Sequence, residues 1–275
     1  MFDLRKLSEE ELLSPLMKFI NIEAEKPDLS MLENPILPLQ NYYPEKPCDL
    51  ANDIPGGENG WSVLENGIGY ISLNISLPHV TARMLYWLLS WQALEPSHYT
   101  ATHPQLHHSA AVSDIDRLKL LNSCITDDVK CLGYTMFSVE KMPYGLEDVI
   151  TMYQSPYDFG LKEAGTGTTG INTASPIICA NFLRQSRSED DPQKKWAGIL
   201  LHRFIAAENR TDMLTRIWLG CRVLRREMKN LLASSNRPDE EYVKMLAEKT
   251  AMEWSHIGKI LPELFHMMST RQTYE

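Results

Sequence analysis

Apolar residues recur at the three-and-four spacing of an α-helix face in two stretches of the chain. The first stretch predicts a helix within residues 78–94, with Thr81 as its N-cap. The second predicts a long C-terminal helix that opens at Pro238 with acidic residues in its first turn, where the helix dipole favours them. The inward stripe of this helix is Val243, Leu246, Thr250, Glu253, Ile257, Ile260 and Leu264.

Runs of β-prone residues lie directly before the first of these helices and fill most of the chain between the two. Residues 61–77 contain two such runs around an Asn66–Gly67 turn, which is the pattern of a β-hairpin. Further strands are predicted within 132–142, 175–183, 196–207 and 213–224. A series of strands closed by one long helix predicts an α+β fold, with a curved antiparallel sheet wrapped around the C-terminal helix.

The first 60 residues have a different pattern. A capping box at residues 8–11 precedes an amphipathic run and predicts a short helix. Residues 27–60 are rich in proline and predict an irregular arm. We therefore divide the chain into an N-terminal helix with a proline-rich arm, residues 1–60, and a globular domain, residues 61–275.

Composition and charge limit the possible partners. The 275-residue chain is 43% hydrophobic and 23% charged, as in ordinary globular proteins, and its formal charge of -9 argues against nucleic acid or an anionic membrane as a partner. No apolar run reaches the ~18 residues of a membrane span. The five cysteines include no CxxC pair, which favours reduced thiols. We expect a cytoplasmic protein, and the sequence is compatible with a homo-oligomer.

Polar residues interrupt the apolar stripe of the C-terminal helix. Glu253 lies within the stripe, with Lys249 four residues before it and His256 three residues after it, so the three side chains can meet on one face. A buried carboxylate is costly unless it is paired, hydrogen-bonded, protonated or bound to a metal. The spacing fits either a structural Lys–Glu pair or a functional site.

A second polar cluster directly follows the first helix. It contains His98, Tyr99, His103, His107 and His108. The histidine spacing is not that of a helical zinc motif, so exposed loop histidines are the alternative to a metal site. Glu140 lies in the predicted strand 132–142, where alternation alone does not decide which face it occupies.

A glycine-rich motif at residues 165–170 matches the pattern GxGxxG. A dinucleotide site requires a helix directly after this motif, because the helix N-terminus binds the pyrophosphate. Here the following residues are β-prone, so we predict a flexible turn instead.

The order of these motifs resembles the diacetylphloroglucinol and phloretin hydrolase family over about residues 61–265. The most specific pieces are HPxxH at 103–107, RxWLG at 216–220 and ILPEL at 260–264. The resemblance implies a helix-grip fold, like that of the birch-pollen allergens, after a smaller N-terminal portion. It also implies hydrolysis of a carbon–carbon bond between an acyl group and a phenolic ring, by a zinc ion that two His and two Glu hold.

By this resemblance, three zinc ligands fall on His107, Glu140 and Glu253, whereas the second zinc-binding His falls on Lys249. The family tyrosine that contacts the phenolic substrate falls on Tyr99. Further motif positions are candidates for substrate binding or for ordinary strand structure: His103, His202, Arg216 and Trp218.

Lys249 departs from the family pattern in a way that matters chemically. An ammonium ion has no lone pair and would repel a metal ion. His107, Glu140 and Glu253 could hold zinc with water in the fourth place only if Lys249 turned away or lost its proton. In the simpler interpretation, the ammonium replaces the charge of the metal and pairs with both carboxylates. The sequence therefore favours a protein without a metal cofactor and leaves zinc as the alternative.

Three functions follow from these alternatives. The favoured one is a diverged, metal-independent enzyme of specialised metabolism that guides cyclisation, such as a Diels–Alder-type closure, of a hydrophobic polyketide- or terpenoid-like molecule. Its catalytic candidates are Lys249, His107, Glu253, Glu140 and Tyr99. The second is a zinc-dependent hydrolase of acylphenols. The third is a non-catalytic carrier of hydrophobic ligands.

Overall fold

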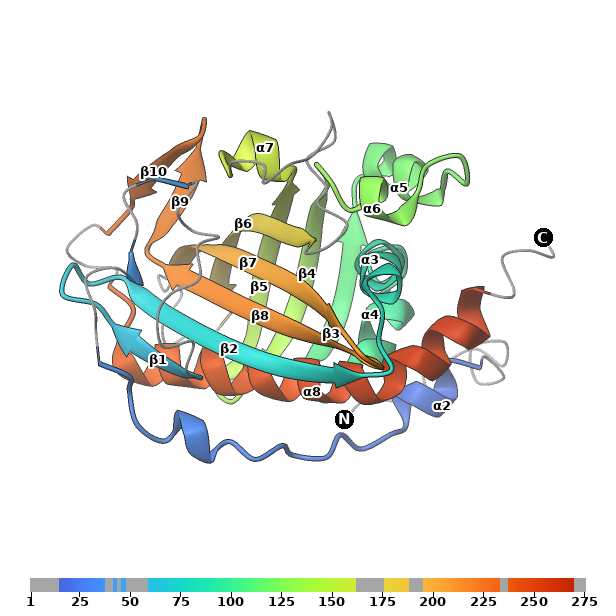
Figure 1. Cartoon of the computed structure of the whole chain (residues 1–275), viewed down its shortest axis with the longest axis horizontal. Helices are drawn as coiled ribbons and strands as arrows, with labels where there is room; N and C mark the ends of the chain where they lie inside the picture. Colours follow the sequence, from blue (N-terminus) through green and yellow to red (C-terminus); the bar gives the residue numbers. More distant parts are fainter. Residues whose placement is uncertain are drawn as a thin grey trace.

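A curved antiparallel sheet wraps around a long helix in the computed structural model (Figure 1). The structure describes residues 15–37, 42–43, 46–47, 59–161, 176–187, 195–232 and 237–269. Within these residues, eight strands form the sheet in the order β1-β2-β8-β7-β6-β5-β4-β3, and the C-terminal helix α8 (Glu240–Ser269) crosses its concave side. The α+β class and the helix-grip architecture that the sequence predicts are confirmed.

Strands β3 to β8 follow one another in meander order, and β8 pairs with β2 of the N-terminal hairpin. The strands of the sheet are β1 (Gly60–Val63), β2 (Gly69–Pro78), β3 (His107–Val112), β4 (Thr135–Met142), β5 (Gly145–Gln154), β6 (Ile177–Ser186), β7 (Lys195–Ala207) and β8 (Arg210–Leu219). A separate hairpin contains β9 (Cys221–Leu224) and β10 (Glu227–Asn230). The shorter helices are α2 (Met17–Ile20), the 3-10 turn η2 (Ser30–Leu32), α3 (Ala82–Trp91), α4 (Pro96–Thr102), α5 (Asp114–Leu121), α6 (Asp127–Lys130) and α7 (Pro156–Phe159).

The local signals for the first hairpin and the first helix are confirmed. Strand β1 pairs with β2 across the Asn66–Gly67 turn, and Gly67 has a φ of 82°, which glycine adopts without the steric cost that other residues meet. Helix α3 starts after Thr81, whose Oγ1 accepts a hydrogen bond from the N–H of Met84 at 3.3 Å. The sequence thus sets the start of α3 through a side-chain cap.

Three of the four later strand predictions correspond to β4, β6 and β7, and the fourth is divided in two. Strand β8 ends at Leu219, and β9 begins at Cys221 after Gly220, which has a φ of 96°. This backbone conformation interrupts the strand and starts the separate β9–β10 hairpin.

Several elements were not predicted, notably α4, β3 and β5. The histidine-rich segment, for which the sequence left exposed loop histidines and a metal site as alternatives, is divided between α4 and the start of β3. Strand β5 contains the buried residue Glu147, so its inward positions are not uniformly apolar and the alternation is weak. The capping box at 8–11 and the glycine motif at 165–170 lie outside the described residues.

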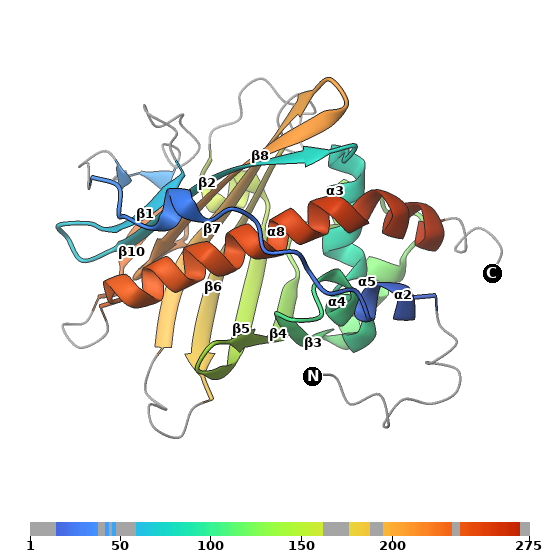
Figure 2. The same cartoon turned by 90° about the horizontal axis from the view of Figure 1, so that it is seen from below.

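Helix α8 packs its predicted stripe against the concave side of the sheet. Val243 and Leu246 pack in one apolar cluster with residues of β2 and β8, whereas Ile257 and Leu264 pack in another with residues of α3. In the C-terminal half of α8, Gly258 lets the helix lie close to β2, because a Cβ at this position would lie 2.8 Å from Cδ2 of Leu77. This packing places the middle of α8 under the centre of the sheet (Figure 2).

The opposite face of β2 and β8 is also covered. Tyr70 and Trp218 pack there with Tyr42 and with residues of the β9–β10 hairpin. Residues of the N-terminal segment run along α8 (Figure 2) and bind the first strand, where the indole of Trp61 donates to the carbonyl oxygen of Leu32 at 2.9 Å. Within the described part of the chain, no helix combines the length and the apolar character that crossing a membrane requires.

Candidate functional site

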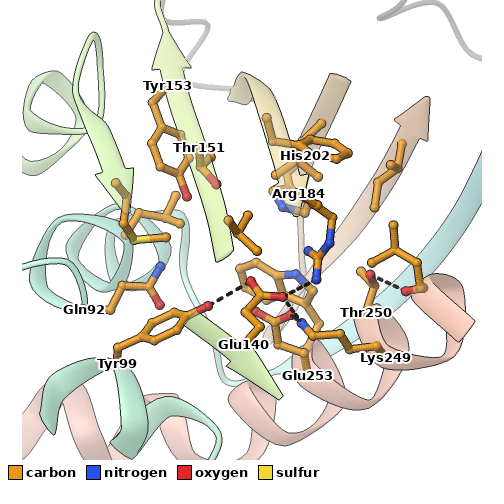
Figure 3. A pocket seen from close by; sticks show the side chains of 18 residues that line it. Gln92, Tyr99, Glu140, Thr151, Tyr153, Arg184, His202, Lys249, Thr250 and Glu253 are labelled. Carbon is orange, nitrogen blue, oxygen red and sulfur yellow. Dashed lines mark hydrogen bonds and ion pairs between the residues drawn. The ribbon is translucent and has the colours of Figure 1, made fainter. Parts of the chain in front are cut away.

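A pocket lies between the concave side of the sheet and α8 (Figure 3). Its cavity volume is about 90 Å³. One water molecule needs roughly 10–15 Å³ on the same measure, so the pocket has room for several waters or part of a ligand. Its apolar walls are Leu89, Met136, Val149, Phe182, Leu200, Ile217, Leu246 and Trp254. Its polar residues are Gln92, Tyr99, Glu140, Thr151, Tyr153, Arg184, His202, Lys249, Thr250 and Glu253. Apolar walls with a few convergent polar groups are typical of small-molecule sites.

Lys249 lies at the polar end of this pocket and pairs with two carboxylates. Its Nζ is 2.9 Å from Oε2 of Glu140 and 3.2 Å from Oε2 of Glu253. Burial favours the neutral amine, but the two carboxylates outweigh it and raise the pKa of Lys249. The side chain is therefore a buried ammonium ion.

Glu140 is held by donors on both of its oxygens. The hydroxyl of Tyr99 donates to Oε1 at 3.1 Å, and Nη2 of Arg184 donates to Oε2 at 2.7 Å. Burial raises the pKa of this carboxyl, but Arg184 and Lys249 reverse the effect and lower it below its ordinary value. The structure also decides the face of β4 that the sequence left open, since Glu140 is buried and Phe137 is exposed.

Arg184 and Glu147 extend the ion-pair network, and the sequence did not indicate either. Nη2 of Arg184 lies 2.6 Å from Oε2 of Glu147, whose carboxylate also accepts a hydrogen bond from the hydroxyl of Tyr242 at 3.2 Å. Glu140 and Glu147 are directly paired in the register of β4 and β5. Two facing carboxylates require a shared cation. A sequence analysis that paired these two strands in the correct register could therefore have predicted a buried cation such as Arg184 beside them.

His107 supports the site from behind Tyr99 and Glu253 rather than lining the pocket. Its ring stacks on Tyr99 at 3.9 Å between centroids, and Nδ1 lies 2.7 Å from Oγ1 of Thr102 and 3.1 Å from the carbonyl oxygen of Tyr99. Nε2 lies 3.2 Å from Oε1 of Glu253, without the alignment of a hydrogen bond. The ring thus joins the backbone of α4 to the carboxylate of Glu253.

The other candidate histidines occupy two places. His202 lines the pocket and bonds through Nδ1 to Oγ1 of Thr215 at 2.8 Å, and burial lowers its pKa to about 4. His103 does not line the pocket and packs edge-on against His256, with 4.8 Å between ring centroids. Burial lowers the pKa of His103 to about 3 and that of His256 to about 4. These side chains are therefore neutral imidazoles near neutral pH.

Arg216 and Trp218 lie away from the pocket, contrary to their proposed role in substrate binding. Trp218 lies on the opposite face of β8, where its indole N–H donates to the carbonyl oxygen of Tyr42 at 2.6 Å. Arg216 shares that face and donates to the carbonyl oxygen of Leu73 at 3.2 Å. Residues on a strand alternate between faces, and it is the intervening Ile217 that lines the pocket.

Several pocket residues were not indicated by the sequence at all. Thr151 and Tyr153 project from β5, and Gln92 follows α3 on the same side of the pocket (Figure 3). None belongs to a recognisable motif, because each is a single polar residue in an otherwise β-prone or helical run. Only the curvature of the sheet brings them opposite the charged residues.

The polar end does not fit a zinc ion. Zinc needs carboxylate oxygens at roughly 2.0–2.2 Å, and the Lys249 ammonium already contacts the facing oxygens of Glu140 and Glu253. In the described ranges of the chain, no three or more His, Cys, Asp and Glu side chains are arranged to hold a metal ion. A cation at this position would also be repelled by the ammonium.

The fold and the pocket together define a helix-grip protein with a buried pocket that has an ion-paired polar end. The chain belongs to the DAPG hydrolase PhiG domain family, whose model matches residues 49–266. This match confirms the family resemblance that the motifs indicated. No curated protein sequence matches the chain.

Solved structures with a similar fold are distant in sequence. The structure of Ara h 8.0201 is 8% identical, with a TM-score of 0.40, and covers 70% of this chain and 97% of its own. A putative uncharacterized protein from Rhizobium leguminosarum is 10% identical, with a TM-score of 0.36, and the match covers 71% of this chain and 97% of that protein. A protein of unknown function from Staphylococcus aureus is 8% identical, with a TM-score of 0.28, and covers 74% and 96%.

Proposed function

We propose that this protein is a metal-independent enzyme that binds a hydrophobic polyketide- or terpenoid-like molecule and guides its cyclisation. The observation that carries the proposal is the Lys249 ammonium held by Glu140 and Glu253. A lysine supplies positive charge at this point but does not generate hydroxide from water near neutral pH, as a bound metal can. The site therefore suits hydrogen bonding and conformational control better than hydrolysis.

The pocket can hold a reactive molecule in one conformation. Apolar side chains such as Phe182 and Trp254 would contact the carbon skeleton, and the polar end would bind its oxygen atoms. Holding two reacting parts of one molecule in contact removes much of the entropic barrier to ring closure. This effect needs neither a nucleophile nor a cofactor.

Lys249 and Tyr99 are the proposed hydrogen-bond donors to the substrate. An ammonium ion has three N–H groups, and two of those of Lys249 face Glu140 and Glu253. The third can donate to a substrate carbonyl, which withdraws electron density from a conjugated alkene, as a Diels–Alder-type closure requires. Burial raises the pKa of Tyr99 well above its ordinary value, so its hydroxyl remains a donor.

Hydrolysis of an acylphenol is the second candidate, because the family is named for a hydrolase. Without a metal ion, a side chain would have to activate the water, and Glu253 is the more exposed of the two carboxylates that line the pocket. Burial raises its pKa, but Lys249 and His107 lower it well below the ordinary value. Such a carboxylate is a weak base, so cyclisation is the better-supported function.

We place this activity in the cytoplasm. Cys131, Cys179 and Cys221 are buried free thiols, and burial raises the pKa of each, which keeps them protonated and unreactive. Unpaired cysteines of this kind are usual in reducing compartments. The formal charge of -9 leaves a small molecule as the partner we propose, rather than nucleic acid.

Metal analysis combined with two substrates tests this function. Protein purified without added metal is expected to contain no stoichiometric zinc and to release no acetate from diacetylphloroglucinol. It is expected to impose an enantiomeric excess on an aryl trienone that otherwise closes slowly to a racemic product. The Lys249→Met variant should lose this excess.

Stoichiometric zinc that disappears in Glu253→Ala would refute the metal-independent site. Acetate release by the metal-free protein would favour hydrolysis over cyclisation. A racemic product, together with binding of the trienone, would favour a carrier.

A further inference from the structure

The ion-pair network at the polar end of the pocket has more negative than positive charge. Three carboxylates, those of Glu140, Glu147 and Glu253, share two cations, Arg184 and Lys249. Burial lowers the pKa of both cations, but the neighbouring carboxylates outweigh it and raise the pKa of each, so both cations stay charged. The five side chains therefore have one negative charge in excess.

The excess charge faces the pocket at Glu253. Glu140 accepts from three donors, and Glu147 is fully buried, does not line the pocket and is bound by Arg184. Glu253 shares its ammonium partner with Glu140, and its side chain is 20% exposed. It is thus the carboxylate with accepting capacity left for a ligand.

His107 is the nearest group that could add positive charge. Its Nδ1 contacts Oγ1 of Thr102 and the carbonyl oxygen of Tyr99, and Nε2 lies beside Glu253. Even a doubly protonated imidazole ring at this position would bring the network to neutrality and not beyond it. With or without that proton, the polar end offers no net attraction to an anion.

An anionic ligand would have to enter a pocket of low dielectric next to an unmatched carboxylate. Like charges placed together in such surroundings cost several kcal/mol, because little water remains to screen them. A neutral ligand with a hydroxyl group avoids this cost and can donate to Glu253. Its carbonyl oxygen can accept from Lys249.

We propose that this pocket selects its ligand by charge and accepts uncharged, hydroxyl-bearing carbonyl compounds while rejecting carboxylates. The inference rests on the proposed small-molecule site and goes beyond it by fixing the ionic state of the substrate. It also implies that a carboxylic acid precursor must lose or mask its carboxylate, by decarboxylation or esterification, before it reaches this protein.

Binding of two matched probes tests the inference. 2,4-Dihydroxyacetophenone and 2,4-dihydroxybenzoate have the same ring and hydroxyl groups, and at about pH 6 only the second has a charged carboxylate. Isothermal titration calorimetry of the full chain should show that the ketone binds about thirtyfold more tightly, or more.

Charge-removing variants separate the effect of charge from the effect of shape. Glu253→Gln removes the excess charge at the pocket surface, and Glu147→Gln removes one charge without touching the ligand. Both should reduce the preference for the ketone by about tenfold. Glu263→Gln is the matched control, since Glu263 lies on α8 but is exposed and pairs with Lys18. It should leave the preference unchanged.

Equal affinity of the wild-type protein for both probes would overturn the charge inference and leave the proposed function standing. Failure of both probes to bind would overturn the small-molecule site itself and the inference with it. Circular dichroism establishes that each variant is folded. If Glu147→Gln does not fold, Glu253→Gln alone decides the outcome.

Discussion

At the scale of single residues, Lys249 determines what the polar end of the pocket can do. Its side chain is 5% exposed and would be costly to bury alone. Glu140 and Glu253 compensate for that cost, and the lysine in turn keeps both carboxylates ionised. The three residues are interdependent, so the loss of one affects the energy of the other two.

Lys249→Met is expected to lower the free energy of unfolding by about 3 kcal/mol or more at neutral pH, because it leaves two buried carboxylates without a shared cation. Denaturant unfolding followed by tryptophan fluorescence measures the change. Lys259→Met is the control on the same helix, since Lys259 is exposed and pairs with Glu25; it should cost less than about 1 kcal/mol. A small effect of Lys249→Met would show that the ion pairs contribute little.

At the scale of elements, three neighbouring strands and one helix bring the charged groups together. Strands β4 and β5 contribute the directly paired Glu140 and Glu147, and β6 contributes Arg184, which lies diagonally from Glu147. Helix α8 contributes Lys249 and Glu253 one turn apart. Because adjacent strands set the distances between these groups, the sheet register fixes the geometry of the site. Strand β7 has a different role, because Gly198 leaves space for the ring of Phe182 in the pocket wall.

Gly198→Ala on β7 is expected to destabilise the fold and to weaken ligand binding. A Cβ at Gly198 would lie 2.2 Å from Cζ of Phe182 and 2.7 Å from the carbonyl oxygen of Trp218, so Phe182 would have to move within the pocket wall. The cost in unfolding free energy should be about 1–3 kcal/mol. Thermal unfolding and calorimetry with 2,4-dihydroxyacetophenone measure both effects. Ala207→Ser, at the exposed end of β7, should change neither.

At the scale of the whole molecule, the packing of the curved sheet around α8 buries ionisable side chains away from water. His103, His202 and His256 are each at most 3% exposed. Burial lowers the pKa of all three, so they stay neutral in the folded protein at pH values where an unfolded chain would protonate them. Stability must therefore depend on pH.

The free energy of unfolding is expected to fall as the pH is lowered from about 6.5 toward 4, because the unfolded chain binds protons at these histidines and the folded chain resists them. Each histidine should contribute a slope of about 1.4 kcal/mol per pH unit within that range. The pKa values of Glu140 and Glu253 are lowered, so their pairs should stay ionised there and weaken only at lower pH.

Urea unfolding at a series of pH values measures this slope. His103→Phe should flatten it by the contribution of one histidine, whereas His79→Asn, at an exposed position, should not. A stability that is independent of pH across this range would contradict the buried, neutral state of the three side chains.

Local patterns in the sequence were sufficient for the elements with strong periodicity or capping. Thr81 predicted the start of α3, Asn66–Gly67 predicted the first hairpin, and the stripe on α8 placed Glu253 and Lys249 together. The short elements α4 and β3 were missed because their few residues carry no clear period. Arg184 was missed because a single arginine in a β-prone run resembles an exposed strand residue.

By itself, the sequence determined the α+β class, the family and the chemical departure at Lys249, because these depend on periodicity, motif order and the identity of one side chain. The tertiary structure alone decided which residues share the pocket. It placed Arg184 beside Glu140 and turned Trp218 to the opposite face. The reason is that strand register and sheet curvature set distances between residues far apart in the chain, and a local pattern does not specify either.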